Sequence, residues 1–287
     1  MSSFACTLLQ LFLLRIFLVQ ASVAGASSLV SISNVTSAID ENKTNIGDIN
    51  NMKDIDYYVL TKRITHNMYD KYKLRIPEVK FVCHHRPEED NITKKDLIWH
   101  SSSKVLSHGF FRMHSRVRIC SWDKILYHFS RTNTTGFHWI IEDDVYLSMD
   151  SRYKLDSYDS DHSDLITLGW RKEYKINDSW PHWEHNKHDY FNFNDTELGA
   201  TLNTIIRVSG RLIESALEYQ RMHNSFIFHE LLFYSLCKKN KYSVHNVKDE
   251  RIKNHALSWT HKSFKIDDIS RYTIKHPLKL WYNLPNL

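Results

Sequence analysis

The 287-residue sequence predicts an α/β fold in which helices flank a mixed β-sheet within a single domain. Short, unbroken apolar runs are typical of strands that are covered on both faces. Longer segments carry apolar residues at the spacing of an amphipathic helix. The two kinds of segment are interspersed along the chain, which favours α/β over an all-β fold or a helical bundle. With 42% hydrophobic and 25% charged residues, the composition excludes collagen-like, disordered and polytopic membrane proteins.

The first half of the domain is predicted to contain three strands and one helix. Residues 56–60 and 79–83 are short runs rich in aromatic and β-branched side chains, each followed by polar residues, which indicates strands. From 114 to 129, apolar residues recur close to helical spacing. The next run, 137–141, reads Phe-His-Trp-Ile-Ile and is typical of a strand buried on both faces.

The second half is predicted to contain two more buried strands and then two helices, in the order 164–170, 202–208, 211–219 and 226–237. The tail after Lys262 is predicted to be irregular, because Pro277 and Pro285 interrupt it.

The N-terminus indicates entry into the secretory pathway. From Leu8 to Val19 the chain is almost wholly apolar, and small residues follow, which is the order of a signal peptide and its cleavage site. A segment taken from Phe4 to Val30 is also long enough to span a bilayer, so an uncleaved type II anchor is the alternative. Residues 1–26 are therefore expected to be a signal peptide or a signal anchor.

Residues 27–52 show no sustained period and are expected to form a linker or stalk, which leaves 53–287 as the folded domain. Asn-x-Ser/Thr sequons support a luminal location, in the endoplasmic reticulum or Golgi, with the protein secreted or anchored. They lie at Asn34, Asn42, Asn91, Asn133, Asn177 and Asn194. A membrane is expected as a partner only if the N-terminal segment is retained.

Glycine and cysteine usage excludes several kinds of site. The seven glycines are too dispersed to form either glycine-rich phosphate-binding loop, so any bound phosphate must be held in another way. A formal charge of +5 without a long run of Lys and Arg argues against a nucleic-acid partner. After the N-terminal segment, Cys83, Cys120 and Cys237 remain, an odd number without CxxC spacing, which indicates neither a disulfide framework nor a zinc site.

Three adjacent acids, Glu142, Asp143 and Asp144, follow the buried run 137–141 directly. Open α/β sheets bind ligands at the carboxyl ends of their strands, which is where these acids would project. In an extended chain Glu142 and Asp144 point to one side and Asp143 to the other. Because adjacent carboxylates repel one another, a compensating cation is expected, and Mg²⁺ or Mn²⁺ prefers such ligands together with substrate phosphates.

This region resembles a known family. HWIIEDDVYLS, residues 138–148, is similar to the Asp-x-Asp region of GT-A glycosyltransferases, and its surroundings are most similar to the family 25 group of lipooligosaccharide and collagen galactosyltransferases. Residues 118–122 resemble that family's Gly-Cys-x-x-Ser-His-x-x-x-Trp helix, and 164–169 resemble its Asp-x-Ile-x-Leu-Gly strand. Gly199, Ser209 and Leu212 resemble its Gly-x-Tyr-x-x-Ser segment, so the likeness extends over 115–213.

The resemblance implies a GT-A-like, Rossmann-like catalytic domain that uses a nucleotide-sugar donor and Mn²⁺ or Mg²⁺. Asp144 is then the expected direct metal ligand, with Glu142 and Asp143 near the metal or the donor ribose. The ion stabilises the leaving nucleoside diphosphate as a Lewis acid. A histidine late in the chain is expected to complete the metal shell, and His261 is favoured over His255.

An inverting enzyme also needs a general base for the acceptor hydroxyl, and Glu230 is the candidate because its expected helical neighbours are apolar. The alternative is a helix-start glutamate that caps backbone amides, and His229 is a second candidate for the base. Arg207 and Lys262 are candidate diphosphate partners, with surface charges as the alternative.

The acceptor is expected to be a glycan or a glycoprotein. Two other functions fit the same acids: a metal-dependent phosphoesterase, and a secreted, catalytically inactive binding protein in which the acids hold a structural ion.

Overall fold

The computed structural model describes residues 55–88, 92–111, 119–169, 171–175, 180, 182–183, 193–247 and 274–276, together with the backbone of 255–257. These residues belong to one compact unit that comprises residues 50–287. The expected signal segment, 1–26, and linker, 27–52, lie outside the described residues, as do His261 and Lys262.

The described chain alternates strands and helices. They are β1 (Ile55–Thr61), α2 (His66–Arg75), β2 (Lys80–Cys83), the 3-10 turn η1 (Lys94–Asp96), β3 (Leu97–Trp99), α3 (Ser102–Ser107), α4 (Ser121–Phe129), β4 (Phe137–Glu142), β5 (Tyr146–Leu147), α5 (Ser151–Asp156), β6 (Leu165–Thr167), β7 (Arg171–Glu173), β8 (Gly199–Thr201), β9 (Ile205–Ser209), α6 (Gly210–His223), α7 (His229–Asn240), β10 (Val244–Asn246), β11 (His255–Leu257) and β12 (Ile274–His276).

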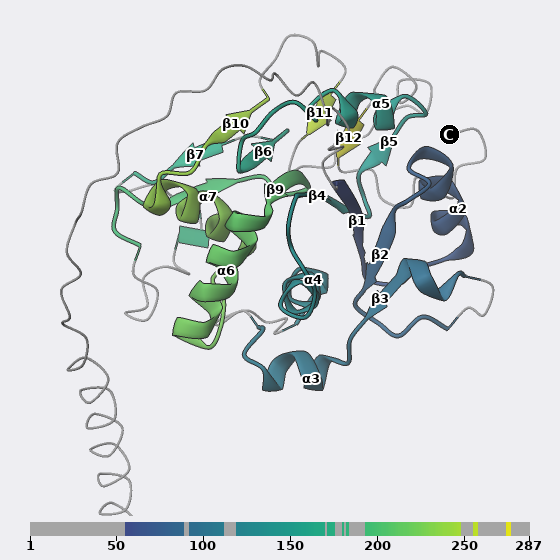
Figure 1. Ribbon diagram of the computed structural model, residues 1–287, viewed down its shortest axis with the longest axis horizontal. Helices are drawn as coiled ribbons and strands as arrows, with labels where there is room; N and C mark the ends of the chain where they lie inside the picture. The colour runs from purple at the N-terminus through teal and green to yellow at the C-terminus, as the bar shows by residue number, and fades with distance from the viewer. Residues whose placement is uncertain are drawn as a thin grey trace, which may run out of the picture. The chain divides into compact units, whose positions relative to one another are not determined.

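Within the described residues the main sheet has seven strands in the order β10-β6-β9-β4-β1-β2-β3 (Figure 1). β9 runs antiparallel to both of its neighbours, and the other strands are parallel to one another. Smaller sheets are formed by β11-β12-β5 and by β7-β8. This mixed sheet with flanking helices confirms the predicted α/β class.

Side chains of the main sheet alternate between two apolar layers, as a strand's period of two requires. In β1, Tyr58 and Leu60 pack with α4, α6 and α7 in one layer. Tyr57 and Val59 pack with α2 and α5 in the other. Figure 1 shows α4, α6 and α7 gathered on one side of the sheet and α2 beside β2. Both faces are therefore covered, which explains why the strands of the main sheet carry nearly unbroken apolar runs.

Most predicted elements are present, with shifted boundaries. The strands predicted at 56–60, 79–83, 137–141, 164–170 and 202–208 correspond to β1, β2, β4, β6 and β9. The two later helices are α6 and α7. The helix predicted from residue 114 is described from Ser121 onward, as α4. The prediction that the tail after Lys262 is irregular was wrong, since β12 forms there. This strand pairs with β5, which lies more than a hundred residues earlier in the chain.

A capping box fixes the start of α4. The backbone N–H of Cys120 donates to Asp123 Oδ2 at 2.6 Å, and the Cys120 side chain accepts from the Asp123 backbone in return. Ser121 Oγ donates to the carbonyl oxygen of Thr61, the last residue of β1, at 2.7 Å. These bonds hold the first turn of α4 against the carboxyl end of β1, beside the end of β4.

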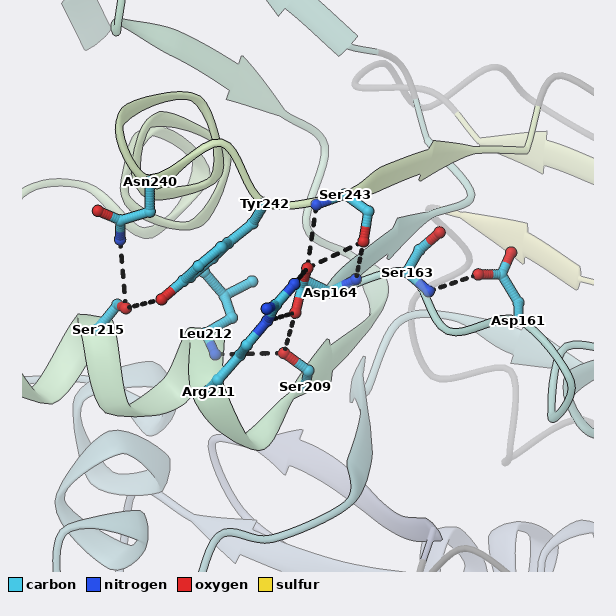
Figure 2. A network of polar contacts seen from close by, with 10 residues as sticks. All are labelled: Asp161, Ser163, Asp164, Ser209, Arg211, Leu212, Ser215, Asn240, Tyr242 and Ser243. Atoms are coloured by element: carbon cyan, nitrogen blue, oxygen red, sulfur yellow. Dashed lines mark hydrogen bonds and ion pairs between the residues drawn. The ribbon is translucent and has the colours of Figure 1, made fainter. Parts of the chain in front are cut away.

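Asp164 ties three elements together at the start of β6 (Figure 2). Its buried carboxylate accepts from the Arg211 guanidinium on both oxygens and from Ser209 Oγ at 2.8 Å. It also accepts from the backbone N–H and the hydroxyl of Ser243, at 3.0 and 2.9 Å. Arg211 in turn lies over the ring of Tyr242, 4.5 Å from its centroid. β6, α6 and the chain entering β10 are therefore held by one carboxylate.

The three cysteines of the folded domain are free thiols, with Cys83 and Cys237 buried and Cys120 half-buried.

Among the described residues, no helix is both long enough and apolar enough to cross a bilayer.

Candidate metal and nucleotide site

The acidic triplet lies where β4 ends between β1 and β9. The backbone N–H of Glu142 donates to the carbonyl of Thr204 at 2.8 Å, and that of Asp143 donates to the carbonyl of Leu60 at 3.0 Å. A turn follows, in which Val145 N–H donates to the Glu142 carbonyl at 3.1 Å. The backbone of the triplet is thus fixed from both neighbouring strands and from its own turn.

Asp143 points toward the end of β1. Its Oδ2 accepts from the Thr61 hydroxyl at 2.6 Å. Burial raises the pKa of Asp143 and the neighbouring Asp144 charge adds to this, whereas the Thr61 hydrogen bond opposes it. Asp143 is therefore held toward β1, and because Asp143 and Asp144 lie in a turn, the alternation expected of an extended chain does not apply to them.

Glu142 and Asp144 face a third residue, His276. One potential ligand atom from each of the three lies within 4.8 Å of the other two. His276 Nε2 is 3.2 Å from Asp144 Oδ1. The antiparallel pairing of β12 with β5, in which Lys275 opposes Tyr146, brings the histidine to this point. The histidine that the structure brings beside the acids is His276, which was not among the expected residues, and the expected His261 lies outside the described residues.

The donor set fits a hard or borderline divalent cation. Two carboxylates and one imidazole suit Mn²⁺, and the carboxylates alone suit Mg²⁺. Asp144 Oδ1 is buried and accepts no hydrogen bond from the described residues. Burial raises the pKa of Glu142 to about 7; a hydrogen bond from Trp122 lowers it and the charge of Asp144 raises it further. Positive charge at the centre of the three residues would compensate the buried Asp144 Oδ1, whose neighbour at 3.2 Å is the His276 imidazole, and would relieve the repulsion between the carboxylates of Glu142 and Asp144.

Glu230 lies in the first turn of α7. The Asn203 backbone N–H donates to its carboxyl group, while the buried Oε2 has no hydrogen-bond partner among the described residues. Burial raises the pKa of Glu230 to about 9, and the charge of Glu142 adds to the effect. The amide that Glu230 binds is thus outside its own helix. A carboxyl with this pKa is protonated at neutral pH, so it becomes a base only when positive charge is near.

A cavity of about 670 Å³ opens beside the acids. Its walls come from the ends of β1, β2 and β4 and from the start of α4. Polar and basic lining groups include Lys62, His84, His85 and Ser121. The cavity is therefore lined by both carboxylates and hydrogen-bond donors, and it lies at the carboxyl edge of the parallel strands, where open α/β sheets bind ligands.

The structure does not bring Arg207 to this cavity. Arg207 is fully buried in β9 opposite Trp139. Its guanidinium donates to the carbonyl oxygens of Tyr158 and Asp161 and lies over the ring of Phe137, 4.2 Å from the centroid. These contacts are those of a buried structural cation. Arg207 is therefore neither a diphosphate partner in this cavity nor a surface charge.

Lys262 lies outside the described residues, and His255 is described only as backbone in β11, next to β12.

Two residues of the site, His276 and Trp122, were not recognised as site residues from the sequence. His276 is marked only by a three-residue strand before Pro277, and the pairing that brings it to Asp144 is not local. Trp122 was noted within the α4 segment, but its indole Nε1–H donates to Glu142 Oε1 at 2.9 Å, a contact that no spacing reveals.

Comparison with known proteins gives limited similarity. No model of a known protein family matches the chain, and no curated protein sequence matches it. Among solved structures, an active-site mutant of LgtC is 10% identical with a TM-score of 0.41, covering 77% of this chain and 86% of that one.

Galactosyltransferase LgtC in complex with donor and acceptor sugar analogs gives 10% identity and a TM-score of 0.40 over the same shares. Mouse xyloside xylosyltransferase 1, in its apo form, gives 9% identity and a TM-score of 0.39, covering 77% of this chain and 97% of that one. Similarity at this level does not assign an activity to the chain.

Proposed function

We propose that this protein is a metal-dependent glycosyltransferase of the secretory pathway, which moves a sugar from a nucleotide-diphosphate donor to a glycan or glycoprotein acceptor. The observation that carries the proposal is the convergence of Glu142, Asp144 and His276 at the edge of the cavity at the carboxyl ends of β1, β2 and β4. The resemblance of residues 138–148 to the Asp-x-Asp region of GT-A enzymes supports the same conclusion.

Each residue of the site has a role in this proposal. Glu142, Asp144 and His276 hold Mn²⁺ or Mg²⁺, which supplies Lewis-acid stabilisation of the leaving nucleoside diphosphate. Asp143, fixed by Thr61, borders the donor rather than the ion. The cavity receives the nucleoside diphosphate, with Lys62 and Ser121 as donors toward its oxygens.

In this proposal Glu230 is the base for the acceptor hydroxyl. The buried Oε2 of Glu230 has no hydrogen-bond partner among the described residues, and the charge of Glu142 raises the pKa of the Glu230 carboxyl group. In an inverting reaction this oxygen accepts the hydroxyl proton once nearby positive charge has lowered its pKa.

The proposal is tested with the full chain and a panel of nucleotide sugars. At least one donor should be hydrolysed or used for transfer in Mn²⁺ or Mg²⁺, and none in EDTA. Asp144→Asn should abolish the activity, whereas Asp150→Asn, at an exposed position whose side chain makes no capping hydrogen bond, should retain it. Full activity of Asp144→Asn, or of the wild type in EDTA, would refute the mechanism.

A metal-dependent phosphoesterase is the second candidate, because the convergence of His276 on Asp144 also satisfies the ligand requirement of that chemistry. It would release inorganic phosphate from simple phosphate esters without a sugar donor. Phosphate release from such esters, with no use of nucleotide sugars, would favour it over the glycosyltransferase. Tight cation binding with no response to nucleotides would instead favour an inactive binding protein.

A further inference from the structure

We propose that Trp122 is a positioning residue of the cation site: its indole N–H holds the Glu142 carboxylate so that one oxygen is occupied and the other faces the cation. The hydrogen bond runs from Trp122 Nε1 to Glu142 Oε1 at 2.9 Å. The inference rests on the cation site of the proposed function and assigns it a residue that is not itself a ligand.

Trp122 is rigidly placed. It is the second residue of α4, whose start is fixed by the Cys120–Asp123 capping box. Its side chain is only 4% exposed, and its ring stacks on the imidazole of His229 with centroids 4.6 Å apart and planes 11° from parallel. An indole held on its face by a neighbouring ring and at its base by a capped helix has little freedom to turn away from Glu142.

Trp122 matters to Glu142 because, among the described residues, the other hydrogen bonds at Glu142 involve its backbone. The Thr204 carbonyl and the turn to Val145 hold the main chain, but a glutamate side chain keeps several rotatable bonds. The indole N–H removes that freedom and takes Oε1, which leaves Oε2 as the ligand atom. Hydrogen-bond partners of metal ligands typically change metal affinity by about 10–100-fold when they are removed.

The same contacts connect the cation site to α7. His229, on which Trp122 stacks, directly precedes Glu230. Trp122 thus lies between the cation ligand on β4 and the first turn of α7, and it fixes the position of one relative to the other.

The test compares two Trp→Phe variants of the full chain. Trp122→Phe keeps an aromatic ring for the stack on His229 but loses the N–H donor. The matched control is Trp139→Phe, because Trp139 lies in β4 itself, is fully buried, and has an indole N–H without a hydrogen-bond partner among the described residues. The dissociation constant for Mn²⁺ is measured by electron paramagnetic resonance of the free ion, and the melting temperature is measured alongside.

The expected result is an Mn²⁺ dissociation constant raised about tenfold or more in Trp122→Phe and essentially unchanged in Trp139→Phe. Equal affinity of Trp122→Phe and wild type would overturn the inference while leaving the cation site intact. A wild type that binds no Mn²⁺ would refute the cation site, and with it both the proposed function and this inference.

A measurement on the wild type keeps the test decisive if Trp122→Phe does not fold. In protein labelled with ¹⁵N at the indole nitrogens, titration with Mg²⁺ should shift one indole N–H resonance and leave that of Trp139, assigned through Trp139→Phe, in place. The shift should be absent in Asp144→Asn. If no indole resonance responds while Mg²⁺ binds, the proposed link between Trp122 and the cation is wrong.

Discussion

Replacing Asp164 by asparagine should destabilise the protein well beyond the effect of an ordinary surface substitution. The carboxylate is 2% exposed and accepts from Arg211, Ser209 and Ser243 (Figure 2). Asparagine keeps one acceptor oxygen but turns the other into an NH₂ donor, which faces groups that are themselves donors. The change therefore leaves a buried donor without an acceptor and removes the charge opposite Arg211.

The magnitude follows from the pKa and from the lost bonds. Burial raises the pKa of Asp164, but the bonds from Arg211, Ser209 and Ser243 outweigh it and lower the pKa from 3.8 to about 2. This shift corresponds to about 2 kcal/mol, and screening at the largely exposed Arg211 side chain reduces it to about 1–2 kcal/mol. An orphaned buried donor costs about 1–3 kcal/mol more. The expected loss is about 2–5 kcal/mol in the free energy of unfolding.

Urea unfolding at several pH values measures this loss. Because the folded pKa is lowered, the charge contribution is complete above about pH 5 and declines as pH falls below 4, to about half at pH 3. Asp195→Asn, at an exposed position, serves as the control and should change the unfolding free energy little. A loss below about 1 kcal/mol for Asp164→Asn at pH 7, or one that does not vary with pH, would refute the reasoning.

Two further substitutions test the packing and the site. Gly210→Ala should lower the free energy of unfolding by about 2–3 kcal/mol, because the added Cβ would lie 1.9 Å from the backbone oxygen of Thr134. Thermal or urea unfolding measures this loss, with Arg221→Ala, an exposed change in the same helix, as the control. A loss as small as that of the control would contradict the prediction. Glu230→Gln should stabilise the protein in EDTA by about 1 kcal/mol or more at pH 8, and by less at pH 5. The reason is that the pKa of Glu230 is raised to about 9 in the folded protein, so the stability of the wild type falls as the pH rises above 4.5. The same variant should transfer sugar poorly, and a pH-independent stability difference would show that Glu230 does not titrate as described.

The central strands could be predicted because they are buried on both faces and therefore carry contiguous apolar runs. The run 137–141 and the acids after it gave the position of the candidate site, since a carboxylate cluster at the end of a buried strand has few structural explanations. The short strands β5, β7, β11 and β12 have no such run. They form through pairing with distant segments, so local pattern does not reveal them.

Individual site residues were harder to predict for the same reason. His276 reaches Asp144 through the β12–β5 pairing, which joins segments far apart in the chain. Arg207 looks like a phosphate partner in sequence, but carbonyl groups from the segment before β6 satisfy it inside the fold. Glu230 was correctly expected to be desolvated. Its helix begins only at His229, so it stands in the first turn rather than within an apolar helical stripe.

The most direct test of the account is calorimetric titration of the wild-type chain with a set of nucleoside diphosphates, in Mn²⁺ and in EDTA. The account predicts that at least one of them binds in Mn²⁺ and not in EDTA, and that Asp144→Asn and His276→Ala both lose this binding because their side chains hold the cation. Equal binding in EDTA, or undiminished binding by either variant, would contradict the claim that Glu142, Asp144 and His276 form a cation-dependent nucleotide site.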